Sequence, residues 1–456
     1  MKRGLFVLLG LGLCQVKVLA PSTLALRFTS GDLRSPNGII EGSTATFGAP
    51  TYGESLIGRL VYFPDSGDYC DDTPEYNTAL NKARKQVSTS DGVQNVFLLA
   101  RGTCTFVQKV YLAQSKGAAA VLMVDSPDSS WDRHKLSRII VADDGMGARV
   151  RIPSVLLTRE DGSALMDAAK ELIVANGQLP LVELEWSLPE ADMVTVDFWT
   201  SNVSPVGPQF LTAFAPAGDA LGPLLDFRLH FFVVEMPAST AREDIAAQCY
   251  RADRRYCTPA LETEGAVKGS TVLEESVRQL CLLNGKSMTK VWWRYLEDFS
   301  NTCAARTVAW EQCSYAILKQ LGAYEQVKNC AESPTRPIRL LEEQKRAKAW
   351  SPLALRINGA KYMGSLDPNL VLKAICSSYR DTPAACTKLL MVSGRESGWS
   401  TGDILFLFLV VIGIFSVGVF LYQRHVVQSV RTSLRHEVMM EVRSQMMDYA
   451  ELREMR

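Results

Sequence analysis

The hydrophobic pattern from residue 26 to residue 190 alternates between two periods. Short apolar, β-prone runs such as Leu56–Phe63 and Val96–Ala100 are typical of strands. Between such runs, apolar residues recur at helical spacing, and one helix is expected to begin near Phe106 and to stop before Gly117. The alternation of strand and helix signals predicts a small α/β domain.

A second folded region is expected from residue 194 to residue 390. A long alternating strand lies in Leu225–Val234, cysteine-bearing helices follow it, and Ser351–Cys376 has the pattern of strand, hairpin, strand and closing helix. This order predicts a thioredoxin-like α/β domain with a helical, disulfide-rich insertion. Two domains also suit about 375 residues, because single domains usually hold about 100 to 200.

The N-terminal residues have the pattern of a targeting segment. Lys2 and Arg3 precede the apolar run Leu5–Leu13, and small residues follow up to Ala25. Residues 1–25 are therefore predicted to be a secretory signal peptide that is cleaved after Ala25. An uncleaved membrane anchor is the alternative interpretation.

A second apolar run, Ile404–Tyr422, is long enough to cross a bilayer of about 30 Å at about 1.5 Å per residue. Asp403 and Arg424 bracket this run, which favours a transmembrane helix over a buried core helix. Arginines after the run place the tail, residues 423–456, in the cytosol by the positive-inside rule. The sequence thus predicts a type I membrane protein with a juxtamembrane linker at residues 391–403.

Charge and cysteine content narrow the possible partners and chemistry. The chain has 49 basic and 49 acidic residues, which gives no electrostatic reason to expect a nucleic-acid partner. Of 11 cysteines, Cys14 is expected to leave with the signal peptide, and the rest lie in a compartment that permits disulfides. These remaining cysteines are Cys70, Cys104, Cys249, Cys257, Cys281, Cys303, Cys313, Cys330, Cys376 and Cys386.

The cysteines are interpreted as disulfide partners. Cys70 and Cys104 are alone in the first domain and are expected to pair, while the cysteines of the second domain allow about 105 connectivities. No CxxC pair occurs, and His134 and His230 are the only histidines between the signal peptide and the apolar run. We therefore expect no metal site and no cofactor.

Several motifs resemble one receptor family in order along the chain. "FGAPTYG", "ARGTCTFVQKV" and "IPSVLLTREDG" resemble the protease-associated domain of plant-type vacuolar sorting receptors. "FWTSN", "QCYRADRRYC", "VRQLC", "VWWRYLEDFSNTC" and "VLKAICSSY" resemble the central domain of the same receptors. The resemblance covers residues 47–386 and implies a protease-associated domain followed by a thioredoxin-like domain.

The chain also departs from the pattern of this family. The receptors carry EGF-like repeats before the membrane, whereas here the short linker alone separates the second domain from the apolar run. The chain is therefore expected to be a shortened form that lacks these repeats and the calcium dependence associated with them.

The sequence favours binding over catalysis. The sequence has no GxSxG elbow, HExxH helix or P-loop. In a thioredoxin fold, "EMPAS" at Glu235–Ser239 would occupy the place of the redox motif after the first strand, and Ser351-Pro352 that of the cis-proline. Because "EMPAS" contains no cysteine, dithiol chemistry is not expected. We expect a binding protein rather than an enzyme.

The loop Arg101-Gly102-Thr103-Cys104 is the leading candidate for the binding site. A turn at Gly102, held by a disulfide, would offer fixed backbone groups, and Arg101 would offer a planar fork of donors. The family resemblance implies that this loop contacts the backbone of a cargo sorting determinant, although Thr103 stands where the family often has an acidic residue. The alternative is that the loop only closes the domain.

Two further sites are expected from short motifs. Tyr449 and Leu452 in the tail have the spacing of a tyrosine-based sorting signal, which would bind a clathrin adaptor. The alternative is an amphipathic tail helix with a stripe from Val427 to Val438. Asn202 begins the sequon of one expected N-glycan, which would make the protein a glycoprotein.

These features predict a cargo receptor of the Golgi, the trans-Golgi network and prevacuolar or endosomal compartments. It would bind soluble vacuolar or lysosomal proteins in the lumen and be collected by adaptors in the cytosol. The alternative function is a membrane-anchored client-binding or folding-assistance protein without redox activity.

Overall fold

The computed structural model describes residues 13–31, 38–62, 69–72, 93–176, 178–200, 206–258, 267–284, 289–304, 309–393, 408, 410–428 and 438–440. The chain divides into two compact units, residues 1–390 and residues 391–456, which are treated separately. The first unit contains both predicted α/β domains.

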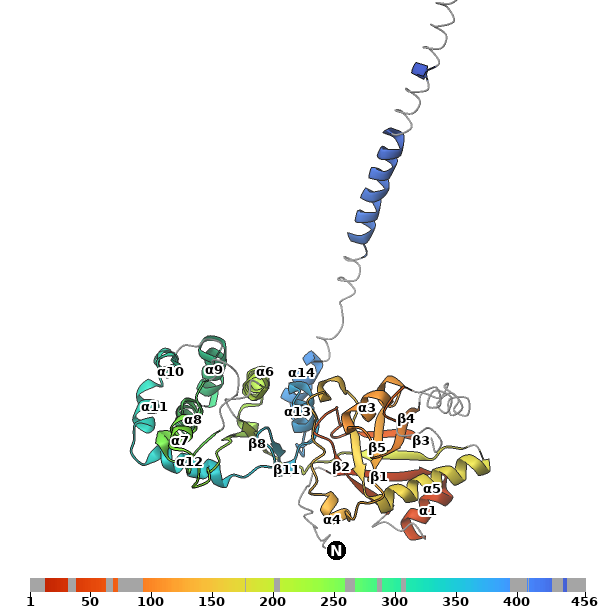
Figure 1. Cartoon of the computed structure of the whole chain (residues 1–456), viewed down its shortest axis with the longest axis horizontal. Coiled ribbons are helices and arrows are strands. Elements are labelled where there is room, and N and C mark those ends of the chain that lie inside the picture. Colours follow the sequence, from red (N-terminus) through yellow and green to blue (C-terminus); the bar gives the residue numbers. More distant parts are fainter. Residues whose placement is uncertain are drawn as a thin grey trace, which may run out of the picture. The chain divides into compact units, whose positions relative to one another are not determined.

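The first domain is a closed β-barrel whose strands follow the order β1-β2-β6-β5-β4-β3-β7 (Figure 1). The strands are β1 (Leu13–Ala20), β2 (Ile39–Thr44), β3 (Ser55–Tyr62), β4 (Gln94–Ala100), β5 (Ala120–Val124), β6 (Ser154–Leu157) and β7 (Leu181–Glu185). Neighbouring strands from β3 to β6 are parallel, while β1 is antiparallel to both β2 and β7. The predicted α/β pattern is therefore confirmed.

The helices of this domain are α1 (Ser22–Ser30), α3 (Phe106–Ser115), α4 (Arg133–Leu136) and α5 (Arg159–Asn176). Strand β4 is buried on both faces, so that Val96 and Leu98 join one apolar cluster while Phe97 and Leu99 join another. The second cluster includes Val110 of α3. Burial on both faces explains why this parallel strand is a continuous apolar run in the sequence.

Strand β1 corrects the prediction for the N-terminus. Residues 13–25 were assigned to a cleaved signal peptide, but β1 pairs with β2 on one side and β7 on the other. The side chains of Cys14, Val16 and Val18 are buried, and Cys14 is a free thiol whose pKa is raised by that burial. The barrel domain thus begins at Leu13 instead of residue 26, and residues 1–12 lie outside the described residues.

The second domain is built on a four-stranded sheet with the order β11-β10-β8-β9. Its strands are β8 (Val194–Thr200), β9 (Leu225–Phe231), β10 (Leu355–Ile357) and β11 (Ala360–Lys361). Strands β8 and β9 are parallel, whereas β10 runs antiparallel to β8. The thioredoxin-like arrangement is confirmed, but the sequence analysis missed β8, so that "EMPAS" follows the second strand of this sheet.

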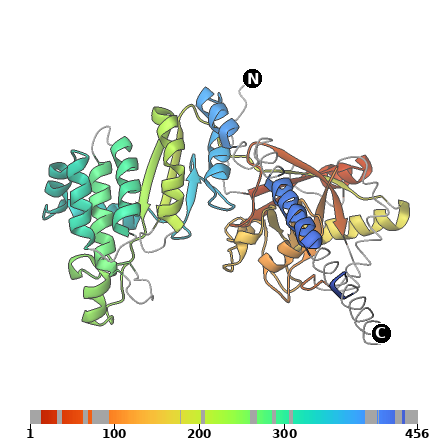
Figure 2. The ribbon, with the colours of Figure 1, turned by 90° about the horizontal axis from the view of Figure 1, so that it is seen from above.

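Helices surround this sheet. They are α6 (Val206–Leu221), α7 (Arg242–Gln248), α8 (Gly269–Leu283), α9 (Thr289–Phe299), α10 (Trp310–Gln320), α11 (Tyr324–Ala331), α12 (Arg336–Arg346), α13 (Pro368–Cys376) and α14 (Ala384–Ser393). The helices between β9 and β10, from α7 to α12, form the predicted insertion. Figure 2 shows the green and teal helices standing side by side next to the sheet. Aromatic rings join the insertion to the sheet, since Phe227 of β9 lies 5.1 Å from Trp293 of α9, measured between ring centroids.

The structure resolves the disulfide pattern. Cys70 pairs with Cys104, as predicted, and the second domain contains the pairs Cys249–Cys257, Cys281–Cys330, Cys303–Cys313 and Cys376–Cys386. Among the described residues, Cys14 in β1 is the free cysteine.

Buried hydrogen bonds join the barrel to the thioredoxin-like domain. The Tyr52 hydroxyl accepts from the Met363 N–H at 2.9 Å and donates to the Met363 carbonyl at 3.1 Å. The Ser365 hydroxyl donates to the carbonyl of Gly48 at 3.0 Å. Burial raises the pKa of Tyr52, which keeps its hydroxyl protonated and able to donate. These contacts hold the two domains in a defined arrangement.

In the second unit, one helix among the described residues is long and apolar enough to cross a membrane. It spans Val410–Gln428 with a mean hydropathy of 1.6. It overlaps the predicted span at residues 410–422 and continues six residues beyond the predicted end at Tyr422. Residues 404–407 lie outside the described residues.

Candidate functional site

The predicted binding loop lies where the parallel strands of the barrel end. Arg101 directly follows β4, Asp125 directly follows β5, and Thr158 directly follows β6. The carboxyl ends of parallel strands meet at one edge of a sheet, so the fold brings these residues together. The sequence analysis identified Arg101 but missed its partner at the end of β5.

Arg101 is held by a buried carboxylate and two aromatic rings. Its Nη1 atom donates to Oδ1 of Asp125 at 2.8 Å, and the Asp125 side chain is 0% exposed. The guanidinium carbon lies 5.5 Å from the ring centroid of Phe106 and 5.1 Å from that of Trp131. These contacts fix the plane of the guanidinium, while the Arg101 side chain remains 37% exposed.

The next residues turn the backbone outward. Gly102 has φ of 134° and Thr103 has φ of 66°, and both residues are exposed. The Cys104 N–H closes the turn by donating to the Gly102 carbonyl at 2.8 Å. Left-handed backbone at a threonine costs about 1 kcal/mol or more, so the turn needs outside support. The disulfide from Cys104 to Cys70 supplies it.

A second turn, at residues 143–147, lies next to Thr105, the residue that follows this loop. Thr105 is the N-cap of α3, and its hydroxyl accepts from the Gln108 N–H at 3.2 Å. The same hydroxyl forms a hydrogen bond to Asp144, which holds the pKa of that carboxyl below its usual range. Residues 143–147 therefore contact the segment that follows Cys104.

Another ion pair that the sequence analysis missed lies at the same edge of the barrel. Arg133 on α4 donates through Nε to Oδ2 of Asp161 at 3.0 Å, and Thr158 donates to the same oxygen at 2.8 Å. Asp161 raises the pKa of Arg133 through this hydrogen bond. The sequence did contain a signal for these residues, because Asp125 directly follows the apolar run Ala120–Val124 and Thr158 directly follows the apolar run Val155–Leu157.

The place of the redox motif contains no thiol in the structure. The Sδ atom of Met236 lies 3.8 Å from Sγ of Cys249, which is bonded to Cys257. Both cysteines are buried, and the nearest following helix, α7, begins at Arg242 with Ala241 as its N-cap. This arrangement offers no exposed thiolate at the start of α7.

Three other predicted site residues cannot be placed on this framework. Asn202, Tyr449 and Leu452 lie outside the described residues. Within the described residues, no group of three or more histidine, cysteine or acidic side chains could hold a metal ion.

The described residues form a disulfide-bonded, two-domain protein with an exposed turn at Gly102 and Thr103 and one candidate membrane span. Family comparisons agree with this class. The model of the vacuolar sorting receptor thioredoxin-like domain matches residues 194–376, and that of the PA domain matches residues 56–165. Over these two domains, in this order, the chain is similar to vacuolar sorting receptors.

Individual relatives are similar to this chain over most of its length. Vacuolar-sorting receptor 1 of Pisum sativum is 28% identical over 76% of this chain, and vacuolar-sorting receptor 7 of Arabidopsis thaliana is 30% identical over 76%. In both cases the chain spans 58% of the length of the relative. Among solved structures, reduced DsbA from Mycobacterium tuberculosis is similar over 45% of this chain and 96% of that chain, with 12% identity and a TM-score of 0.30.

Proposed function

We propose that this protein is a type I membrane receptor that sorts soluble cargo. Its lumenal part binds sorting determinants of vacuolar or lysosomal proteins in the Golgi, and the tail directs delivery to prevacuolar or endosomal compartments. The observation that carries the proposal is the match of both folded domains, in order, to the domains of vacuolar sorting receptors. Binding without catalysis is consistent with the names of the relatives.

The geometry of the loop supports a peptide as the ligand. No hydrogen bond to the main chain of Thr103 occurs within the described residues, so its exposed peptide groups are free to pair with an extended segment. Arg101 uses Nη1 for Asp125, which leaves other donors of its fork for a carbonyl or carboxylate. Because Asp125, Phe106 and Trp131 hold the guanidinium in place, little side-chain entropy is lost on binding.

Replacing Arg101 tests this function. Arg101→Lys retains a positive charge opposite Asp125 but removes the planar guanidinium with its paired donors. We therefore expect the binding free energy of the cargo peptide to become less favourable by about 1 to 3 kcal/mol. Arg101→Ala should weaken binding by a similar amount. The alanine variant should also be less stable than the wild-type chain, because the buried Asp125 carboxylate would lose its ion-pair partner.

Binding is measured by fluorescence anisotropy with the full chain in detergent and a peptide carrying the sorting determinant of a soluble vacuolar protein. A scrambled peptide tests sequence dependence. Arg228→Ala is the control variant, because it removes an exposed ion pair with Asp226 in the other domain. Unchanged affinity in both Arg101 variants would mean that the loop only closes the barrel.

The same measurement separates the alternative function. A client-binding or folding-assistance protein should bind unfolded polypeptides whatever their sequence, and the scrambled peptide should then bind as tightly as the parent. A cargo receptor should discriminate between the two peptides by at least about tenfold, or about 1.4 kcal/mol.

The proposed tail signal leads to a separate prediction. Tyr449→Ala and Leu452→Ala should each move the receptor from Golgi and endosomal membranes toward the cell surface, because each removes one of two side chains that fill adaptor pockets. Surface biotinylation measures the shift, and lumenal peptide binding should stay unchanged. If both variants keep the wild-type distribution while Val430→Asp changes it, the amphipathic helix is the sorting element.

A further inference from the structure

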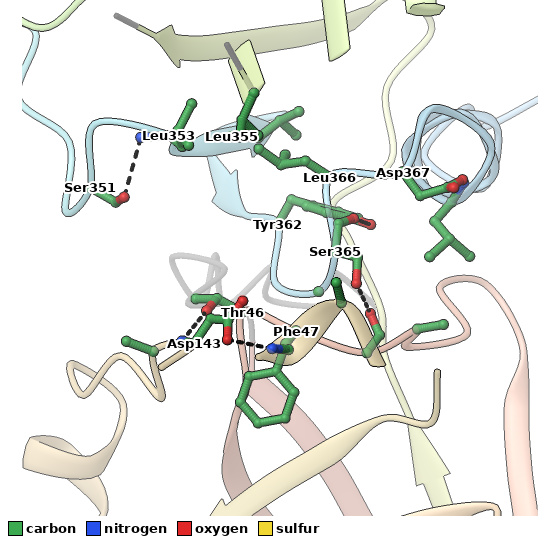
Figure 3. A pocket seen from close by; sticks show the side chains of 18 of the residues that line it. Thr46, Phe47, Asp143, Ser351, Leu353, Leu355, Tyr362, Ser365, Leu366 and Asp367 are labelled. Atoms are coloured by element: carbon green, nitrogen blue, oxygen red, sulfur yellow. Dashed lines mark hydrogen bonds between the residues drawn. The ribbon is translucent and has the colours of Figure 1, made fainter. Parts of the chain in front are cut away.

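A groove lies between the barrel and the thioredoxin-like domain (Figure 3). Its volume is about 1120 Å³, and its walls come from two regions of the barrel, around Thr46 and Asp143, and from residues 350–370 of the second domain. Clefts at domain interfaces are frequent ligand sites. None of the groove residues belongs to the binding loop at Arg101.

The groove is formed in advance of any ligand. Ser365 and Tyr362, which line it, belong to the segment that is hydrogen-bonded to the barrel through Gly48 and Tyr52. The rings of Tyr52 and Tyr362 also lie 5.3 Å apart, measured between centroids. A cleft held by such contacts loses little conformational freedom when a ligand binds.

Its polar side chains are mostly occupied by local hydrogen bonds. Asp367 caps α13 by accepting from the N–H groups of Asn369 and Leu370, at 2.9 and 3.1 Å. Asp143 accepts from the N–H of Gly145 at 2.9 Å and from that of Gly147. These two carboxylates are therefore already engaged, and the rest of the lining combines apolar side chains with polar ones that include Arg151.

Apolar side chains on the second domain face this space. Leu353 and Leu366 are half-buried, and Val206 at the start of α6 is 45% exposed. Figure 3 shows Leu353 and Leu366 on the wall opposite Thr46 and Phe47. Exposed apolar surface in a preformed cleft favours a ligand that carries large apolar side chains.

The turn at residues 143–147 links this groove to the binding loop. Asp143 and Gly147 line the groove, while Asp144 between them is hydrogen-bonded to Thr105, next to Cys104. This turn therefore borders both the groove and the segment that follows Cys104.

We propose that the groove is a second cargo subsite, which takes a large aliphatic or aromatic side chain of the same extended peptide that contacts the Arg101 loop. This inference rests on the proposed function, because it extends the cargo site of a sorting receptor. The barrel loop would bind peptide backbone with little regard to side chains, and the groove would supply selection for an apolar residue.

The test blocks the groove without touching the loop. Ala148 is exposed and lines the groove, so Ala148→Trp fills it, and Val206→Asp places a charge on its wall at a helix N-terminus, where an acidic residue is tolerated. Ala175→Trp on α5 is the matched control, because Ala175 is exposed but lies outside the groove. Two peptides are compared with the full chain in detergent: a sorting-determinant peptide chosen to contain one large apolar residue, and the same peptide with that residue changed to serine.

We expect Ala148→Trp and Val206→Asp each to lower the affinity for the parent peptide at least tenfold. Each should also abolish the difference in affinity between the parent peptide and the serine peptide. Ala175→Trp should leave both affinities unchanged. The inference would be overturned if both groove variants bound the parent peptide with the same affinity as the wild-type chain. If Arg101→Lys still weakened binding in that case, the proposed function would stand and only the groove would be rejected. If the wild-type chain bound neither peptide, the proposed function itself would fail.

Discussion

A chain that starts at Leu26 is expected not to fold, because it lacks β1. This strand closes the barrel between β2 and β7, so its loss exposes two unpaired strand edges. It also removes the buried side chains of Cys14, Val16 and Val18. At about 1.5 to 3 kcal/mol for each fully buried apolar side chain, the lost burial is comparable to the total stability of about 5 to 15 kcal/mol that is usual for proteins.

The experiment compares two secreted chains with the same heterologous leader. One continues from Leu13 and the other from Leu26, and both end at Arg456. The chain from Leu13 should be secreted intact and should resist protease. The chain from Leu26 should be degraded. Mass spectrometry of the protein expressed with its own N-terminus should find Leu13–Ala20 retained. A Leu26 chain with the same unfolding transition as the longer chain would restore the predicted cleavage after Ala25.

Removal of the Cys70–Cys104 disulfide is expected to lower both stability and cargo binding. The bond joins cysteines 34 residues apart, and the loss of loop closure in the unfolded chain corresponds to about 4 kcal/mol. The bond also supports the left-handed backbone of Thr103, so its loss should let the turn relax. A Cys70→Ser/Cys104→Ser double variant should therefore unfold at a lower denaturant concentration and bind the cargo peptide more weakly.

A second double variant separates these two effects. Cys376 and Cys386 are 10 residues apart at the end of the second domain, and removing their bond should cost about 3 kcal/mol. Their bond does not support the turn at Thr103, so peptide affinity measured below the unfolding transition should be unchanged. Equal loss of affinity in both double variants would show that binding follows global stability and not the geometry of the loop.

Much of the fold could be predicted because the sequence carries local signals. In the barrel, β4 and β5 are uninterrupted apolar runs, and the helix before Gly117 ends where predicted. The Cys70–Cys104 pair followed from its isolation in the first domain. Strand β1 was misassigned because apolar alternation after a basic N-terminus is typical of both a signal peptide and a buried strand.

The loop at Arg101 was found from the sequence, but the contacts that shape it were not. Asp125 and Trp131 are distant from Arg101 along the chain, and nothing in their local sequence shows which side chain they face. Parallel strands bring Asp125 beside Arg101, and this pairing turns a flexible arginine into a fixed donor. It also implies that Arg101→Ala would destabilise the protein, because a buried carboxylate would lose its ion-pair partner.

The sequence by itself determined the order of the two domains, the apolar run near the C-terminus, the candidate loop and the absence of a thiol from "EMPAS", since each depends on residues that are neighbours in the chain. Tertiary structure alone decided that Leu13–Ala20 closes the barrel, that Asp125 holds Arg101 and that a groove opens between the domains. These features depend on long-range pairing, for example between Tyr52 and Met363, which are 311 residues apart. Periodicity describes which face of one element is buried, but it does not specify the distant element that covers that face.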